Sequence, residues 1–360
     1  MAFSFRRELN LTGTKQDYFN SQRWKKTFIV LFILLAIIAF SISITVGFYN
    51  ASVIECYETI WNHLTGNIVN TQADNIIWGS RLPIAIFAIV CGAALSIGGA
   101  VMQSILRNPL ADPYMMGISS GASLGVALSI IAGVTIGTSI SSTVSQVIMA
   151  FIFSLIPVAV ILLFSFKRRT TPTKLILIGV AVSYVFSACT TLLMLAADEQ
   201  SLSDVYSWNV GSLATISWDS LPIPITVTVI GIAVLMLLGN KINVMMSGEN
   251  VAHSLGINTH RMTIVLMVIV ALMTAAVVSF CGTIGFIGLV GPHIARIFVG
   301  SNSRYLLPAS AAFGGAFLLI ANSIASVAGT AGLPVGVVSA LIGCPIFIVI
   351  LFKTKKKEWT

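Results

Sequence analysis

The stretches of this chain that lack any charged residue decide what it can fold into. Residues 113–166 contain no Asp, Glu, Lys or Arg, and as one α-helix they would extend about 80 Å at about 1.5 Å per residue. In the whole sequence 56% of residues are hydrophobic and only 9% are charged, whereas soluble domains carry about 25% charged residues. A soluble fold could not bury this much apolar surface, so we expect the chain to lie in a lipid bilayer.

The fold class follows from the needs of the backbone in lipid. Only helices and closed barrels satisfy every backbone N–H and C=O group inside a bilayer. Barrel strands alternate apolar and polar residues over about ten positions, but the apolar runs here are continuous. We therefore predict an all-α, polytopic transmembrane protein.

The apolar runs predict about ten crossings, because one crossing needs about 20 helical residues. We expect one crossing in each of four runs and two in each of three longer ones: 27–48, 82–106, 175–197 and 220–240, then 113–166, 262–303 and 305–352. The first long run is expected to turn near residues 133–142 and the third near residues 329–334. Residues 262–303 could form one long helix, or a helix and a shorter returning helix broken at Gly291-Pro292.

The basic residues set the orientation. The two tails are rich in Lys and Arg, so the positive-inside rule places both termini in the cytoplasm and requires an even number of spans. Residues 262–303 then supply two, and of the 20 Lys and Arg residues only Arg81 falls outside the cytoplasmic side. The orientation of the chain in the membrane explains its net positive charge, so we expect no nucleic-acid partner.

The predicted organisation is a single membrane domain with short polar tails. We expect a cytoplasmic N-terminal tail at 1–26, one transmembrane domain at 27–352 with a cytoplasmic loop at 241–261, and a basic cytoplasmic tail at 353–360.

The sequence offers no catalytic, metal or nucleotide site. The Asp and Glu residues fall in loops, tails or span ends, which argues against a proton- or ion-coupled secondary transporter. No phosphate-binding loop is present, no pair of cysteines is spaced as CxxC, and no Ser/His/Asp set suggests an intramembrane enzyme. His293, beside a membrane-embedded segment, is interpreted as a structural histidine. If ATP drives this protein, another chain binds and hydrolyses it, and we expect no cofactor here.

Three glycine patterns stand out. Gly117, Gly121 and Gly125 repeat every four residues, which favours close helix packing. A second series recurs every three residues from Gly282 to Gly291 and predicts a broken helix lining a cavity. In the longest cytoplasmic loop, glycines enclose a short amphipathic turn, which could be an ordinary surface loop or a helix that a partner grips. Its residues are Gly248, Glu249, Asn250, Val251, Ala252, His253, Ser254, Leu255 and Gly256.

Taken together, several motifs resemble the FecCD-type permeases of binding-protein-dependent ABC importers for iron(III)-siderophore, haem and vitamin B12. They are Arg-Leu-Pro at 81–83, Arg-Asn-Pro-Leu-Ala-Asp-Pro at 107–113, Gly-Ile-Ser-Ser-Gly-Ala at 117–122, Trp208 followed by Gly-Ser-Leu at 211–213, the segment 248–256, the segment 285–296, and Leu-Pro-Val-Gly at 333–336. The resemblance runs in order from about residue 27 to 352. It is specific for the family and says little about the substrate.

The resemblance implies a prokaryotic cell-membrane permease that works in an assembly. A second copy or a sister permease would enclose a central pathway, two cytoplasmic ABC ATPase subunits would dock on residues 248–256, and an extracytoplasmic binding protein would deliver the ligand. Asn108 and Leu110 would contribute to a cytoplasmic gate, and Thr173 to a second gate layer. The ligand expected first is an iron(III)-siderophore, with a corrinoid second and haem third.

Two departures from the family pattern concern the external face. The family commonly has a second arginine after Arg-Leu-Pro, where this chain has Ile84, and Asp-Thr-x-x-Arg before the last span, where residues 322–326 read Asn-Ser-Ile-Ala-Ser. Such arginines meet acidic residues of the binding protein. We therefore expect docking to depend on Arg81 and on uncharged contacts.

Overall fold

The computed structural model describes residues 15–47, 49–135, 141–167, 171–328 and 332–353, and all regular elements within these ranges are helical. The helices on the N-terminal side of the chain are α1 (Lys15–Thr45), α2 (Val53–Thr65), α3 (Thr71–Ile76), α4 (Leu82–Leu106), α5 (Ile118–Ile130), α6 (Ser142–Lys167) and α7 (Pro172–Leu195). Those that follow are α8 (Glu199–Asn209), α9 (Pro222–Met246), α10 (Glu249–Ser254), α11 (Thr259–Cys281), α12 (Ile287–Val299), α13 (Ser303–Val327) and α14 (Val335–Lys353). A π-helical turn (Ile77–Arg81) joins α3 to α4, and 3₁₀ turns occupy Pro113–Met116 and Trp218–Ser220.

The number of long helices agrees with a polytopic membrane protein. Eight helices are long and apolar enough to cross a bilayer, and α5 and α12 are shorter apolar helices. Both have 13 residues, about 20 Å of helix, so neither crosses the roughly 30 Å hydrocarbon core alone. The expected ten crossings are therefore eight full spans and two half-length helices.

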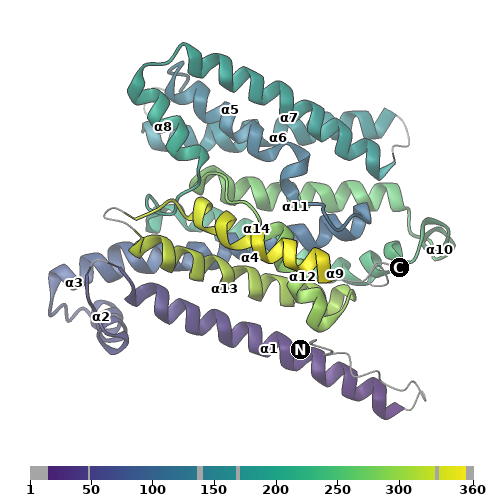
Figure 1. Cartoon of the computed structure of the whole chain (residues 1–360), viewed down its shortest axis with the longest axis horizontal. Coiled ribbons are helices and arrows are strands. Elements are labelled where there is room, and N and C mark those ends of the chain that lie inside the picture. The colour runs from purple at the N-terminus through teal and green to yellow at the C-terminus, as the bar shows by residue number, and fades with distance from the viewer. Residues whose placement is uncertain (1–14, 48, 136–140, 168–170, 329–331, 354–360) are drawn as a thin grey trace.

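The helices form a bundle around α4 (Figure 1). Helix α4 packs against α13, α12, α11 and α9, while α1 packs on the outer side of α13. Helices α5, α6 and α7 form a separate group, joined to the rest through α11. The C-terminal end of α14, the start of α1 and α10 lie at one end of the bundle, and α2, α3 and α8 lie at the other (Figure 1). The first end is the cytoplasmic side predicted from the charges.

Glycines let α4 approach its neighbours through backbone contacts. A Cβ atom at Gly99 would overlap the carbonyl of Gly288 in α12, and one at Gly92 would overlap the carbonyl of Gly314 in α13. Small residues allow such close contact between membrane helices. Because α4 is surrounded on all sides, nearly all of its residues are buried.

The prediction of a broken helix within residues 262–303 is correct, but its place is wrong. The break is an extended segment at 282–286 between α11 and α12, whereas Gly291 and Pro292 lie inside α12. A proline inside a helix frees the carbonyl four residues earlier. Here that carbonyl belongs to Gly288, and the side-chain amide of Gln103 donates to it from 3.5 Å. The freed carbonyl thus keeps a partner, and the helix continues through the proline.

Candidate functional site

The turn after α4 runs back into the bundle. Arg107 adopts a left-handed conformation with φ 47°, which reverses the chain direction. Pro113 then lies against Gly98, about two turns before the end of α4. The backbone N–H of Leu110 donates to the side chain of Asn108 over 3.0 Å. Residues 108–113 therefore climb beside α4 instead of staying in the cytoplasm.

This turn is tied to the loop that carries α10. The Arg107 guanidinium donates to the carbonyl of Met245 over 2.6 Å, across the end of α9. Leu110 is exposed. Thr173 lies in the first turn of α7, and its side chain lies outside the described part of the chain. The gate assignment of Asn108, Leu110 and Thr173 remains a prediction.

Because the turn folds back, it buries an acidic residue. Asp112 is 7% exposed, lies against Gly288 of α12, and accepts a 2.8 Å hydrogen bond from the backbone of Tyr114. Asp112 lies in a loop, as expected, but this loop is inside the bundle, so the inference that the chain has no buried acid is wrong. The reason is a contact between two segments far apart in the sequence.

Tyr114 joins this turn to the helix break. Its hydroxyl donates to the carbonyl of Ile284 over 3.3 Å and accepts from the N–H of Ile284 over 3.2 Å. The extended segment 282–286 leaves backbone groups without helical partners, and unpaired buried backbone groups are costly. One side chain therefore holds both polar groups of Ile284.

The turn and the break border a cavity of about 410 Å³ on the side of α7. Its polar lining residues are Asp112, Tyr114, Ser183, Tyr184 and Ser187. No Lys, Arg or His is among the described residues that line it. Gly285 also lines the cavity, which agrees with the predicted broken helix beside a cavity. The helix face that carries Gly121 and Gly125 instead packs against the backbone of α6, as expected.

His293 has the structural role expected of it. It is buried within α12, its Nδ1 lies 2.8 Å from the carbonyl of Leu289, and Gln103 lies 3.4 Å from the same nitrogen. The ring of Phe347 meets it edge-on. These contacts hold the imidazole between α4, α12 and α14.

Residues 248–256 form a short helix with glycine ends. Gly248 and Gly256 have φ values of 125° and 75°, which side chains other than glycine adopt only under strain. Between them, Ala252 is buried, while Val251 and Leu255 are exposed on one side of α10. The helix projects at the cytoplasmic end of the bundle (Figure 1). Its use as an ATPase-coupling helix remains a prediction.

Arg81 has contacts that the sequence did not indicate. Its guanidinium donates to the carbonyls of Ile44, Thr45 and Tyr49 over 3.2, 2.8 and 2.7 Å. The first two are carbonyls at the C-terminal end of α1, which lack helical partners. Arg81 therefore caps α1, and its role in binding-protein docking stays a prediction.

Arg81 also lines a hollow of about 580 Å³ on the external side. Asn322 and Ser326, which stand where the family pattern has charged residues, line the same hollow, as do Ser80 and Ser212. The departures from the pattern thus meet at one place.

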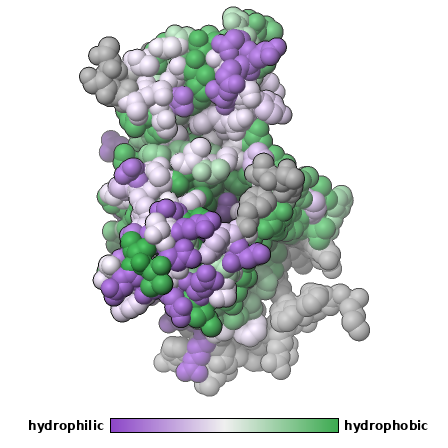
Figure 2. Space-filling view, turned by 90° about the vertical axis from the view of Figure 1, so that its left-hand side faces the viewer, coloured by the Kyte–Doolittle hydropathy of each residue, from purple (hydrophilic) through white to green (hydrophobic). Residues whose placement is uncertain are grey.

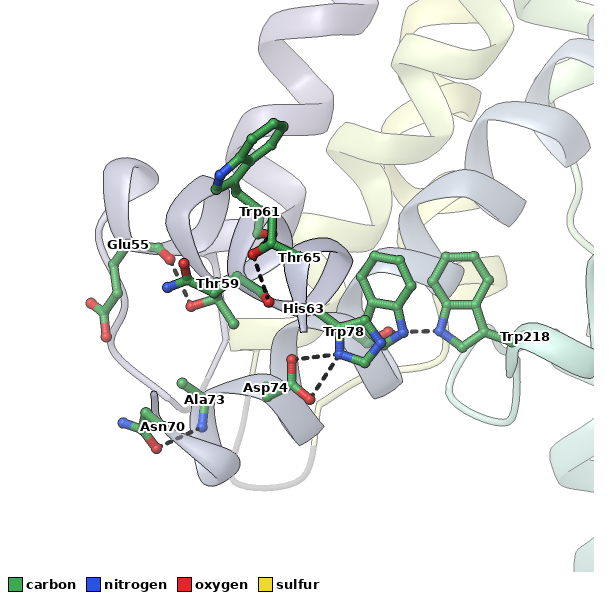
Figure 3. Close-up of polar contacts among 11 residues, drawn as sticks. Glu55, Thr59, Trp61, His63, Thr65, Asn70, Ala73, Asp74, Trp78 and Trp218 are labelled. Carbon is green, nitrogen blue, oxygen red and sulfur yellow. Dashed lines mark hydrogen bonds and ion pairs between the residues drawn. The ribbon is translucent and has the colours of Figure 1, made fainter. Parts of the chain in front are cut away.

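A polar and aromatic cluster connects α2 to the entrance of α4 (Figure 3). His63 Nδ1 lies 2.8 Å from a carboxylate oxygen of Asp74. The His63 ring stacks on Trp78 with 4.0 Å between centroids, and the Trp218 indole donates to the Trp78 carbonyl over 2.9 Å. The cluster fixes α2, α3 and the turn before α9 relative to one another.

Comparison with known proteins identifies this architecture. The model of the FecCD transport family matches residues 29–353. The chain belongs to the FecCD transport family. It is thus the permease subunit of an ABC importer, it resides in the prokaryotic cell membrane, and the ATPase of such a transporter is a separate subunit.

The FecCD relatives differ in what their names say they carry. The chain is 38% identical to the cobalamin import permease BtuC of Halobacterium salinarum, covering 79% of this chain and 75% of that protein. It is 31% identical to the molybdate import permease MolB of Haemophilus influenzae, covering 90% and 94%. It is 33% identical to the hemin transport permease HmuU of Yersinia pestis, covering 91% and 96%.

A solved structure has the same fold. It is described as an inward-facing conformation of a putative metal-chelate type ABC transporter, and it matches with a TM-score of 0.81 and 29% identity over 91% of this chain and 100% of that chain.

Proposed function

We propose that this permease imports an iron(III)-siderophore complex delivered by an extracytoplasmic binding protein. The cavity beside the helix break carries this proposal. Its described lining combines hydroxyl groups with the Asp112 carboxylate and has no cationic side chain. A small oxyanion such as molybdate would be repelled by a buried carboxylate and would find no positive partner. A bulky chelate that shields its metal does not need a positive partner in the cavity.

The cavity also supports an assembly of two permeases. It is open on the face that carries Tyr184, whose side chain is largely exposed. A second copy or a sister permease packed against α7 would close it into a central pathway. At the other end, Val251 and Leu255 of α10 offer an apolar contact for an ATPase subunit. Two permeases would thus hold two ATPase subunits, which would bind the ATP.

A corrinoid is the second candidate. The support for it is the 38% identity to the cobalamin permease of H. salinarum. Haem is the third candidate, on the weaker identity to the hemin permease.

Uptake into membrane vesicles tests the proposal. Vesicles containing this chain with the ATPase encoded beside it and the binding protein outside are given radiolabelled iron(III)-siderophore, cobalamin, haem or molybdate, with or without internal ATP. We expect ATP-dependent accumulation of the siderophore complex alone. Accumulation of cobalamin or haem would show that this ligand, and not an iron(III)-siderophore, is the substrate. Accumulation of molybdate would contradict the argument that the cavity disfavours oxyanions.

A further inference from the structure

Helix α2 lies outside the bundle and presents three different faces. One face packs inward: Cys56 is fully buried, and its thiol points at the carbonyl of Ile44 in α1. The polar side carries Glu55, and Glu58 lies at the border of this side, next to Ile54 and Trp61. The third face is apolar and largely exposed, with the Tyr57 hydroxyl touching Ser41 of α1 at its edge. Its members are Ile54, Tyr57, Trp61 and Leu64, which are 71%, 44%, 66% and 64% exposed.

The spacing of these four residues makes one continuous stripe. They follow one another at three, four and three positions, which places them on the same side of a helix. Figure 3 shows Trp61 pointing away from the side of α2 where His63 meets Asp74 of α3. A surface patch of large apolar side chains on a water-exposed helix is unusual and marks a contact site.

The position of the stripe relative to α1 indicates what covers it. The Tyr57 hydroxyl lies 2.9 Å from the hydroxyl of Ser41, about one turn before the external end of α1. The neighbouring outward residues of α1, Ile37, Ile38 and Ile42, are themselves exposed within a membrane span. The stripe therefore continues the lipid-facing surface of α1 at the depth where the span ends.

Helix α2 lies far from the surface that would contact a second permease, so a second permease cannot be what covers the stripe. Helix α1 lies on the opposite edge of the bundle from α7 (Figure 1), and the cavity that a second permease would close is on the α7 side. A helix beside α1 at the external end faces the surrounding bilayer.

We propose that α2 is an interfacial membrane helix that lies in the outer headgroup region, with Ile54, Tyr57, Trp61 and Leu64 inserted among the lipids. Amphipathic helices bury their apolar face about 5–10 Å into this region, and Trp and Tyr are enriched at this depth because their rings are apolar while their N–H and O–H groups remain hydrated. The polar side, with Glu55, then points to water, and Glu58 lies at its border. Since α2 has no Lys or Arg, its attachment depends on apolar burial and not on anionic lipids.

The attachment has a structural consequence inside the protein. His63 on α2 contacts both Asp74 and Trp78, and Trp78 accepts the hydrogen bond of Trp218. The depth of α2 in the bilayer therefore fixes the depth of the turn that begins α4 and of the loop before α9.

Site-directed spin labelling in proteoliposomes tests the assignment. Single cysteines are introduced as Ile54→Cys, Leu64→Cys and, as the control at the polar border of the stripe on the same helix, Glu58→Cys. The partly exposed Cys189 and Cys344 are first replaced by serine. Each label is measured for collision with oxygen, which concentrates in lipid, and with a water-soluble nickel chelate. Because all three positions are exposed, folding is checked only by size-exclusion profile.

We expect the labels at 54 and 64 to collide with oxygen and lose most contact with the nickel chelate, and the label at 58 to keep clearly more contact with the chelate. The pattern should be the same in zwitterionic and anionic vesicles. Equal access of the nickel chelate to all three positions would place α2 in water and overturn the proposal. Protection of 54 and 64 from both reagents would mean a protein contact there and would overturn it equally.

Discussion

Arg81 shows how one residue can serve two demands. Its three hydrogen bonds to backbone carbonyls hold the end of α1 to the start of α4, while docking would need its charge on the surface. We expect Arg81→Gln to lower the stability of the protein in detergent by about 1–2 kcal/mol, because hydrogen bonds to a charged group are worth more than neutral ones but this group is partly exposed. Thermal unfolding measures this, with the exposed cytoplasmic Arg304→Gln as control.

Arg81→Lys separates the two roles. Lysine keeps the charge but lacks the planar fork that reaches several carbonyls at once. If docking uses the charge, this variant binds the binding protein normally while its melting temperature falls. Normal binding by Arg81→Glu would remove Arg81 from the docking surface.

Tyr114 carries the second prediction at this scale. Tyr114→Phe leaves the N–H and C=O of Ile284 without their partner, and a buried unsatisfied group costs about 1–3 kcal/mol. We expect a lower melting temperature and faster proteolysis near the break at 282–286. Tyr206→Phe on the surface of α8 is the control, and an unchanged melting temperature for Tyr114→Phe would show that the clamp contributes nothing.

At the scale of elements, α10 is expected to transmit force to the ATPase. Val251→Asp or Leu255→Asp places a charge in the apolar contact and should reduce substrate-stimulated ATP hydrolysis severalfold, since charges are disfavoured at interface cores. Uptake and ATPase activity are measured together in proteoliposomes. Ser301→Asp, in the loop between α12 and α13, adds the same charge elsewhere on that side. Full activity of the α10 variants would exclude this helix as the docking element.

The elements themselves could largely be predicted from the sequence. Length and charge alone place a turn between α5 and α6, a turn between α13 and α14, and two helices within residues 262–303, all of which the helix bounds confirm. A shorter returning helix is among the predictions for residues 262–303, but the position of the break before it could not be predicted. Glycine and proline at 291–292 suggest a break, yet α12 continues through them, and Gln103, far away in the sequence, donates to the carbonyl that the proline frees.

The site was less predictable than the elements because its parts come from distant segments. Nothing local shows that Asp112 would lie against Gly288 or that Arg107 would bond to Met245. Both contacts depend on the chain reversing at Arg107 in a left-handed conformation. The conformation of Arg107 depends on tertiary packing and cannot be predicted from hydropathy or from the spacing of motifs.

At the scale of the whole molecule, the external face is rich in hydrophilic residues (Figure 2), and most of its charged residues are acidic. Its acids are Glu55, Glu58, Asp74, Asp198, Glu199, Asp204 and Asp219, and among the described residues of this face the only Lys or Arg is Arg81. Hydrogen bonds from the backbone and hydroxyl of Ser201 hold the pKa of Asp198 below its usual value, so this carboxyl stays charged. Away from Arg81, a partner that docks on this face is expected to present basic residues.

Salt and charge substitution test this expectation. Combining Glu199→Gln with Asp204→Asn should weaken binding-protein affinity roughly two- to thirtyfold, because each of the two exposed pairs is worth about 0.2–1 kcal/mol, and should flatten its salt dependence. Binding is measured on the detergent-solubilised permease, with the exposed Ser203→Ala on the same helix as control. Affinity that rises when the acids are neutralised would mean that the partner is itself acidic.

The glycine contacts around α4 also limit how this protein can move. Where backbone touches backbone, at Gly92 with Gly314 and at Gly99 with Gly288, no flexible side chains lie between the helices to absorb a displacement, and packed interiors do not deform continuously. We therefore expect α4, α12 and α13 to move together as one rigid body. Opening of the pathway to one side of the membrane and then the other would then come from movement of the surrounding helices relative to this group. Helix α7, across the cavity, is one of them.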